Sequence, residues 1–109
     1  MPFFVLPLTV GANSSNQASF SGIAGEIYRA GLYFPLNAGG VLFVSVRIGN
    51  LIFPTPVAGG SSELNADNFF VELPFPEPYS ISAGEEIVIY GRNTDALYPH
   101  TVYLWLWVR

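Results

Sequence analysis

Apolar and polar residues alternate along this chain in short runs that are typical of β-strands. The runs are rich in Val, Ile, Phe, Tyr and Trp, and clusters of Gly, Pro, Asn and Ser separate them. The spacing of an amphipathic helix is nearly absent, because Gly or Pro interrupts almost every window of about fifteen residues. The pattern predicts strands over residues 3–10, 26–34, 41–48, 51–56, 68–74, 78–82, 86–91 and 101–108.

Seven or eight short strands in 109 residues indicate an all-β protein, an antiparallel β-sandwich that is jelly-roll-like and has almost no helix. We expect a single domain over residues 1–109, because a domain usually takes roughly 100–200 residues. The polar segment 11–17 is expected to be a loop between the first two strands, with additional strand character near Phe20.

Segment 41–53 predicts the clearest local element, a β-hairpin that turns at Gly49-Asn50. These two residue types favour the positive φ angles of a two-residue hairpin turn. With this turn Ile48 pairs with Leu51, and a slip of one residue would exchange the two faces. One face is then wholly apolar and the other is mixed; the apolar face comprises Leu42, Val44, Val46, Ile48, Leu51 and Phe53.

The last predicted strand is apolar on both faces. Alternate residues of a strand point to opposite sides, so the aliphatic set (Val102, Leu104, Leu106 and Val108) is expected to face the core. The opposite side carries what we call the aromatic stripe, Tyr103, Trp105 and Trp107. A sandwich has one interior, so the stripe needs a further partner. A loop of the same chain, a neighbouring subunit or a ligand that stacks on the rings would each suffice.

The first predicted strand is also apolar on both sides. Phe3 and Val5 point one way, and Phe4, Leu6 and Leu8 point the other. From this strand we take Phe4 and Leu6 as further candidates for an interface or for ligand stacking, beside the aromatic stripe.

The charge content of the chain argues against partners that bind basic surfaces. Charged residues make up 11% of the chain, and four arginines, no lysine and eight acidic residues give a net charge of −4. Nucleic acids and anionic membrane surfaces bind basic patches, which four scattered arginines cannot form. No apolar run approaches the ~18–20 residues of a membrane-spanning helix. We therefore expect no nucleic-acid partner and no membrane insertion.

Residues that could carry catalysis are few. His100 is the only histidine and lies near Asp95, and triads are defined by geometry rather than by order in the sequence. No G-x-S-x-G nucleophile motif accompanies them, so a turn or surface role is expected for His100. Glu72, Glu77 and Glu86 are acids that strands could gather as in glycosidases, although solvated strand edges account for them more simply. We expect that the protein is not an enzyme.

Metal and cofactor sites have equally little support in the sequence. The chain has no cysteine, which excludes disulfides, iron–sulfur clusters and thiolate zinc sites. Segment 65–68 offers alternating oxygen ligands, but it lacks the acids and the Gly of an EF-hand, and Asx turns explain it. The Gly-rich segments 37–40 and 58–62 do not precede a helix, as a phosphate-binding loop requires. We expect no cofactor and no bound metal.

The stretch from Gly40 to Arg109 contains strands, turns and loops in a characteristic order. A strand, a tight turn and a strand ending in Phe-Pro-Thr-Pro are followed by a loop, an acidic strand pair, the run 82–93 (SAGEEIVIYGRN) and a hydrophobic closing strand. This order resembles β-sandwich and jelly-roll structural proteins of bacterial and archaeal viruses, such as small capsid, decoration and spike components. The run 82–93 is similar to segments of many β-sandwich modules, including carbohydrate-binding ones.

The resemblance implies a virion protein that assembles with copies of itself and with other shell proteins. It also implies synthesis in the host cytoplasm, and the amino terminus lacks the positive region of a secretory signal. Low charge and exposed aromatic residues favour such an assembly independently, since monomers seldom show large apolar patches and interfaces are poor in Lys. The alternative is a carbohydrate- or receptor-binding module that uses the aromatic stripe. We predict that another chain covers the stripe, so that Trp105→Ala or Trp107→Ala impairs assembly more than folding.

Overall fold

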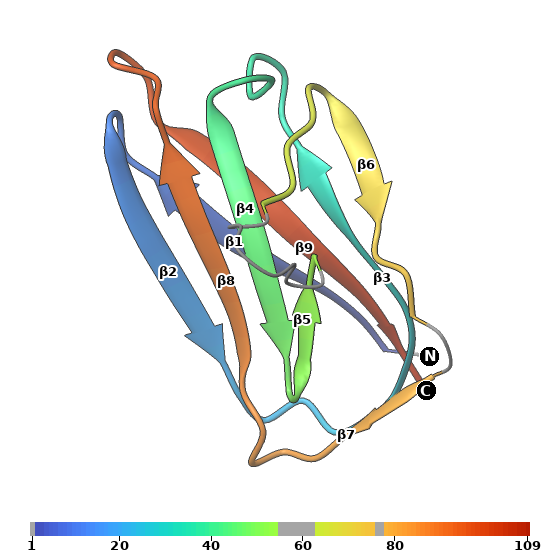
Figure 1. Ribbon diagram of the computed structural model, residues 1–109. Helices are drawn as coiled ribbons and strands as arrows, with labels where there is room; N and C mark the ends of the chain where they lie inside the picture. Colours follow the sequence, from blue (N-terminus) through green and yellow to red (C-terminus); the bar gives the residue numbers. More distant parts are fainter. Residues whose placement is uncertain (1, 55–62, 76–77) are drawn as a thin grey trace.

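The computed structural model describes residues 2–54, 63–75 and 78–109, which form an antiparallel β-sandwich (Figure 1). The described residues contain nine strands and no helix, which confirms the predicted fold class. In this part of the chain there is accordingly no helix that could cross a membrane. The strands are β1 (Phe3–Val10), β2 (Ser14–Phe20), β3 (Gly25–Phe34), β4 (Leu42–Ile48), β5 (Leu51–Phe53), β6 (Phe69–Glu72), β7 (Tyr79–Ile81), β8 (Ile87–Asn93) and β9 (His100–Val108).

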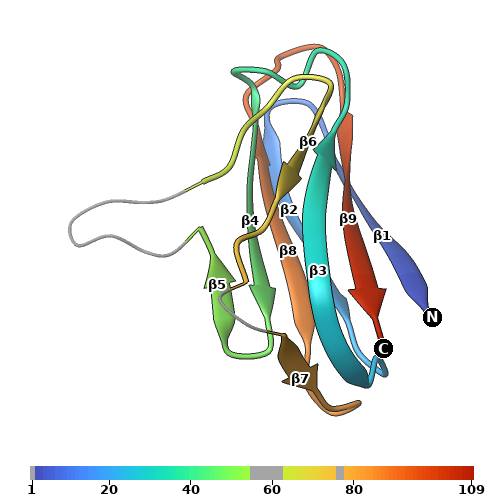
Figure 2. The same ribbon diagram turned by 90° about the vertical axis from the view of Figure 1, so that its right-hand side faces the viewer.

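The strands form two sheets that pack face to face, as the edge-on view shows (Figure 2). Sheet A has the order β1-β9-β3-β6, with β7 also paired to β3, and sheet B has the order β2-β8-β4-β5. The last two strands lie in the middle: β9 separates β1 from β3 in sheet A, and β8 separates β2 from β4 in sheet B. The chain therefore crosses repeatedly between the sheets, which makes the sandwich jelly-roll-like.

Strand β2 corrects the prediction of a loop over residues 11–17. It pairs with β8 along its whole length, from Ser14 opposite Asn93 to Phe20 opposite Ile87, at the edge of sheet B. Of its side chains only Ala18 and Phe20 pack against the core. An edge strand with one solvated face can be almost wholly polar, and such a strand lacks the hydrophobic alternation on which the prediction relied.

The predicted hairpin is confirmed in its register and its faces. Val46 pairs with Phe53, Arg47 with Ile52 and Ile48 with Leu51. Only Gly49 of the two turn residues has a positive φ, 57°, which corresponds to a type II′ turn with Gly in its first central position. The predicted strand 51–56 ends at Phe53, and residues 55–56 lie outside the described part of the chain.

The core lies between the two sheets and is built from aliphatic side chains of both. The four aliphatic residues of β9 are buried in it as predicted. Gly91 of β8 makes room for β1, because a Cβ there would come within 2.6 Å of the Val10 side chain. Phe4 and Leu6, the two candidates on β1, are partly buried and pack against this core. They therefore do not share a face with the aromatic stripe.

Candidate functional site

The outer surface of sheet A carries a continuous group of aromatic side chains. The register of β1 and β9 places Phe3 opposite Trp107 and Val5 opposite Trp105. On the other side of β9, Tyr33 of β3 lies opposite Tyr103, and Phe70 of β6 lies opposite Tyr33. We call this group the aromatic face; it consists of Phe3, Val5, Tyr33, Phe70, Tyr103, Trp105 and Trp107. The structure thus extends the predicted stripe across four strands.

Apart from Tyr103, the rings of the aromatic face pack against one another. The centroid of Trp105 lies 5.8 Å from that of Phe3, 5.3 Å from that of Phe70 and 6.2 Å from that of Trp107. Phe70 meets Trp107 edge to face, and Phe3 meets Trp105 in the same way. These separations and tilts are those of favourable aromatic pairs. The two indoles are therefore held by neighbours from β1 and β6.

Gly31 of β3 explains how Phe70 reaches the two tryptophans. It sits opposite Trp105 on one side and Glu72 on the other, in the middle of the sheet. A Cβ built on Gly31 would lie 2.1 Å from the Phe70 ring. The ring thus occupies the space that any other residue at position 31 would fill. A Gly inside a strand often marks such a close approach.

Arg29 limits the aromatic face at one end. Its guanidinium lies 4.5 Å from the Trp107 ring centroid and binds Glu72 through two hydrogen bonds, of 3.0 and 3.2 Å. The β3 register shifts between Ile27 and Arg29, so Ile27 is buried in the core while Arg29 points outward. In a regular strand, residues i and i+2 point to the same face, so Ile27 and Arg29 would otherwise lie on one side of the sheet. The irregularity therefore turns Arg29 to the outer face, where its guanidinium stacks on Trp107.

The aromatic face remains partly open to solvent. Phe3 and Val5 are each 46% exposed and Tyr103 is 36% exposed, whereas Trp105 and Trp107 are half-buried. The contacts that cover the indoles come from side chains on the same face, namely Phe3, Tyr33, Phe70 and Arg29. This arrangement leaves an aromatic surface on the outside of the sandwich, made of rings tilted against one another.

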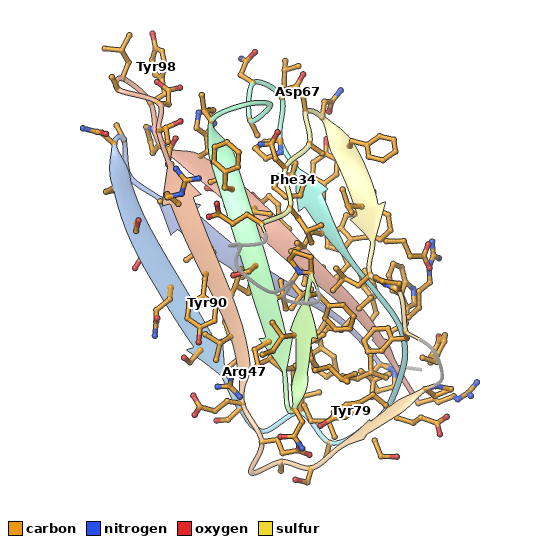
Figure 3. The ribbon with its side chains drawn as sticks, viewed as in Figure 1. Phe34, Arg47, Asp67, Tyr79, Tyr90 and Tyr98 are labelled. Atoms are coloured by element: carbon orange, nitrogen blue, oxygen red, sulfur yellow. The ribbon has the colours of Figure 1, made fainter. Side chains whose placement is uncertain are left out.

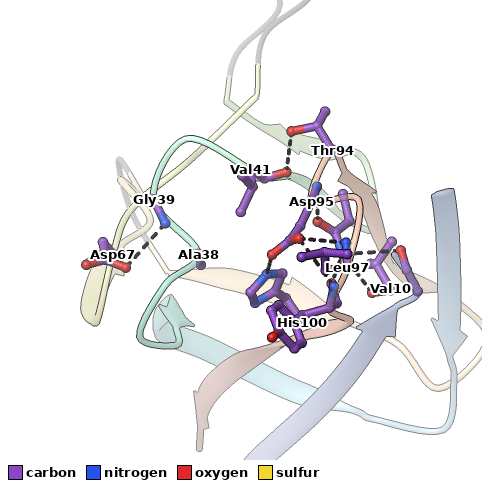
Figure 4. A network of polar contacts seen from close by, with 12 residues as sticks. Val10, Ala38, Gly39, Val41, Asp67, Thr94, Asp95, Leu97 and His100 are labelled. Carbon is purple, nitrogen blue, oxygen red and sulfur yellow. Dashed lines mark hydrogen bonds and ion pairs between the residues drawn. The ribbon is translucent and has the colours of Figure 1, made fainter. Parts of the chain in front are cut away.

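His100 and Asp95 organise the loop between β8 and β9 (Figure 4). His100 is buried and its Nε2 lies 2.9 Å from Oδ2 of Asp95, while Oδ1 accepts hydrogen bonds from the backbone N–H groups of Leu97 and Tyr98. The hydrogen bond from the Leu97 N–H lowers the pKa of Asp95 most, and the hydrogen bond with His100 lowers it further. Within the described residues the imidazole makes no other hydrogen bond, so no hydroxyl nucleophile joins the pair there.

Asn93 completes the support of this loop, and sequence reasoning assigned it no role. Its buried side-chain amide donates to the carbonyls of Val10, Gly11 and Tyr98, and its Oδ1 accepts from the Asp95 N–H. The amide therefore ties β1, β8 and the start of β9 together. This network satisfies backbone groups that would otherwise be left unpaired at the end of the sandwich.

The other candidate groups have structural partners. Asn65 bonds to Gly40 N and to the carbonyls of Ala38 and Leu42, and Asp67 Oδ1 accepts from Gly39 N. These bonds run to a neighbouring loop, in place of the local Asx turns expected for segment 65–68. Among the described residues no group of three or more His, Cys, Asp or Glu could hold a metal ion.

Of the three acids considered for glycosidase chemistry, the two that the structure describes belong to different sheets. Glu72 binds Arg29 on sheet A, whereas Glu86 directly precedes β8 of sheet B. Glu77 lies outside the described residues.

The chain matches no family model, no curated protein and no solved structure. Its function has to be inferred from the geometry of its surface.

Proposed function

We propose that this protein is a structural subunit of a large assembly, a virion shell, and that the aromatic face of sheet A binds a neighbouring copy of the chain. The observation that carries this proposal is the aromatic face itself. It places rings from four strands side by side on the outside of a small, weakly charged sandwich. Soluble monomers seldom expose contiguous apolar patches of more than a few hundred Å².

The stabilisation available from this face is large enough for an interface. A fully buried aromatic side chain removes roughly 150–250 Å² from water. Less than half of that remains available on each ring of this face, since Phe3 is 46% exposed, Tyr103 is 36% exposed and the other rings are less exposed. Several such rings together therefore contribute on the order of 10 kcal/mol at about 25 cal/mol per Å², before the costs of association. A standard interface buries about 800 Å² per partner, so polar residues around the rings would complete it.

The packing of the rings favours a protein partner over a stacked sugar. A ligand that stacks on an aromatic residue needs one open ring face. The Arg29 guanidinium covers Trp107, while Phe3 and Phe70 pack edge-on or tilted against the indoles. The surface that remains is an uneven mosaic of ring edges and faces, which another protein surface can complement.

The fold supports the proposal more weakly than the face does. Jelly rolls occur in viral capsid proteins, and they also occur in lectins. Function belongs to sites rather than to folds, so the strand order alone cannot separate an assembly subunit from a binding module. The chemistry of the outer face of sheet A favours the assembly subunit.

The proposal is tested by the mass of the protein in solution, measured by analytical ultracentrifugation over a range of concentrations. We expect the wild-type chain to self-associate and Trp105→Ala to shift it toward the monomer. Tyr90→Ala is the matched control, because Tyr90 is an exposed aromatic residue on sheet B. Far-UV circular dichroism checks that each variant is folded.

A second variant separates assembly from folding. Val5→Glu places a charge on the rim of the aromatic face at a side chain that is already 46% exposed, so it creates no cavity. We expect this variant to fold and to remain monomeric. A wild-type chain that stays monomeric at millimolar concentration, or a Val5→Glu variant that still assembles, would contradict the proposal.

A further inference from the structure

A shallow hollow lies on the side of the molecule opposite to the aromatic face, on the outer face of sheet B. It is a shallow groove of about 520 Å³. Tyr90 on β8 lies between Gln17 on β2 and Ser45 on β4 in the strand register, and Figure 3 shows its position on this face. We call it the polar groove; its side chains are those of Ser15, Gln17, Ser45, Glu63, Tyr90 and Arg92.

Tyr90 differs from the tryptophans of sheet A in having an open ring. It is 39% exposed, and within the described part of the chain it has neither an aromatic neighbour nor a hydrogen bond to its hydroxyl. Its ring face and its hydroxyl group are therefore both available to a ligand.

The groups around Tyr90 are polar and have unused hydrogen-bonding capacity. The side chains of Ser15, Gln17 and Ser45 make no hydrogen bond to any other described residue. Arg92 binds Glu63 through Nε and Nη2, at 3.2 and 2.8 Å, and its Nη1 makes no hydrogen bond to another described residue. Stacking of the guanidinium at 4.5 Å from the Phe43 ring centroid holds the pair in place. The groove thus presents oriented donors and acceptors beside an open ring.

This chemistry selects among classes of ligand. Glu63 neutralises Arg92, so the groove has no surplus positive charge for a phosphate or a sulfate. An apolar ligand would remove the amide and the hydroxyl groups from water without giving them partners. A neutral sugar fits both conditions, because its hydroxyl groups donate and accept and its C–H face can lie on a ring.

We propose that the polar groove binds a neutral carbohydrate, with Tyr90 as the stacking surface. Gln17 and the Arg92–Glu63 pair supply the hydrogen bonds to the sugar hydroxyl groups. The groove is on sheet B and the aromatic face is on sheet A, so this inference does not depend on the proposed assembly. A subunit that assembled through sheet A would keep the groove open to solvent, where it could attach to a glycan.

Saturation-transfer and ¹H–¹⁵N NMR on the full chain test this inference with the methyl glycosides of glucose, galactose, mannose and N-acetylglucosamine. We expect at least one of them to bind with a millimolar Kd and to shift amide signals of β2, β4 and β8. Tyr90→Ala should weaken that binding at least tenfold, and Gln17→Ala should weaken it several-fold. Tyr103→Ala, an exposed tyrosine on sheet A, should leave it unchanged.

Any of four results would overturn the inference. The first is no saturation transfer to any of the four sugars at tens of millimolar. The second is binding that persists in Tyr90→Ala, and the third is binding that is lost in Tyr103→Ala, which would move the ligand to sheet A. A sulfated galactoside serves as a charged comparison, and tighter binding of this probe would exclude the neutral class. None of these results bears on self-association, so the two proposals can fail separately.

Discussion

The two outer faces of the sandwich are built on the same scaffold and differ in what their rings do. Each carries an arginine that binds a glutamate through two hydrogen bonds and lies 4.5 Å from the centroid of an aromatic ring, Arg29 on sheet A and Arg92 on sheet B. On sheet A further rings surround that ring. On sheet B the arginine itself lines the polar groove. The same local motif therefore lies at the rim of an apolar surface in one place and beside a hydrophilic groove in the other.

The difference arises from the strands that flank the central ones. In sheet A the central strand β9 is bordered by β1 and β3, and Phe70 of β6 reaches across Gly31 to join its tryptophans. In sheet B the edge strand β2 contributes Ser15 and Gln17 to the outer face. Rings that touch one another leave little open ring face for a ligand, while an isolated ring such as Tyr90 keeps its face free. Two faces of one fold can thus serve different partners.

The strongest test of the aromatic face is Gly31→Ala. The added methyl group would overlap the Phe70 ring, so the ring must leave Trp105 or the strands must separate. We expect a loss of about 1–3 kcal/mol in the free energy of unfolding, which is typical of overpacking. Urea denaturation followed by tryptophan fluorescence measures it, and the emission of the folded state should shift because the indoles lose a neighbour.

Gly84→Ala is the matched control for this substitution. A Cβ at Gly84 meets no atom within 4 Å, and its φ does not lie in the positive range. We expect its stability to match that of the wild type within about 0.5 kcal/mol, as for most surface substitutions. Equal losses in the two variants would show that Phe70 does not occupy the position over Gly31.

Much of the fold was predictable from the sequence, because it depends on local patterns. The alternation in residues 101–108 and the Gly49-Asn50 turn each determine a face or a register without reference to distant residues. Strand β2 was missed because its outer face is polar and its partner lies far away in the sequence. The polar groove was missed with it, since Gln17 meets Tyr90 only through that pairing.

The aromatic face was predicted only along a single strand. Trp105 and Trp107 were identified, but their neighbours come from three other strands whose register the sequence does not reveal. Phe4 and Leu6 were chosen because both sides of β1 are apolar, and a single strand cannot indicate which side meets the core. Gly31 inside a predicted strand is a local signal that another group approaches the backbone closely there, and the structure shows that this group is the Phe70 ring.

Acid should weaken the ends of the sandwich that connect the two faces. Asp95 accepts hydrogen bonds from Leu97, Tyr98 and His100, and these bonds lower its pKa. Because the folded-state pKa is below the unfolded value near 3.8, the carboxylate stabilises the fold above that pH. This contribution is lost as the pH falls through the folded-state pKa. The pKa of Glu85 is lowered as well, first by the hydrogen bond from the Ser82 backbone N–H and then by the hydrogen bond from the Tyr79 hydroxyl.

Asp95→Asn should therefore destabilise the protein more at pH 7 than at pH 2. The free energy of unfolding in urea at the two pH values measures this, and Glu85→Gln should behave in the same way. Glu86→Gln is the control, because the Glu86 carboxylate makes no hydrogen bond to a described residue. A loss in Asp95→Asn that is the same at both pH values would contradict the role of the Asp95 carboxylate.

The two arginines give the smallest expected effects on folding and the most direct comparison of the faces. Both ion pairs are solvent-exposed, so Arg29→Gln and Arg92→Gln should each leave most of the stability in place. Arg29→Gln leaves the Glu72 carboxylate without its arginine partner at the rim of the proposed interface, so self-association should weaken. Arg92→Gln should leave self-association unchanged and should reduce sugar binding, because it removes the guanidinium donors from the polar groove. Ultracentrifugation and sugar titration of both variants measure the two effects. If either variant changes both properties to the same extent, the two faces do not act independently.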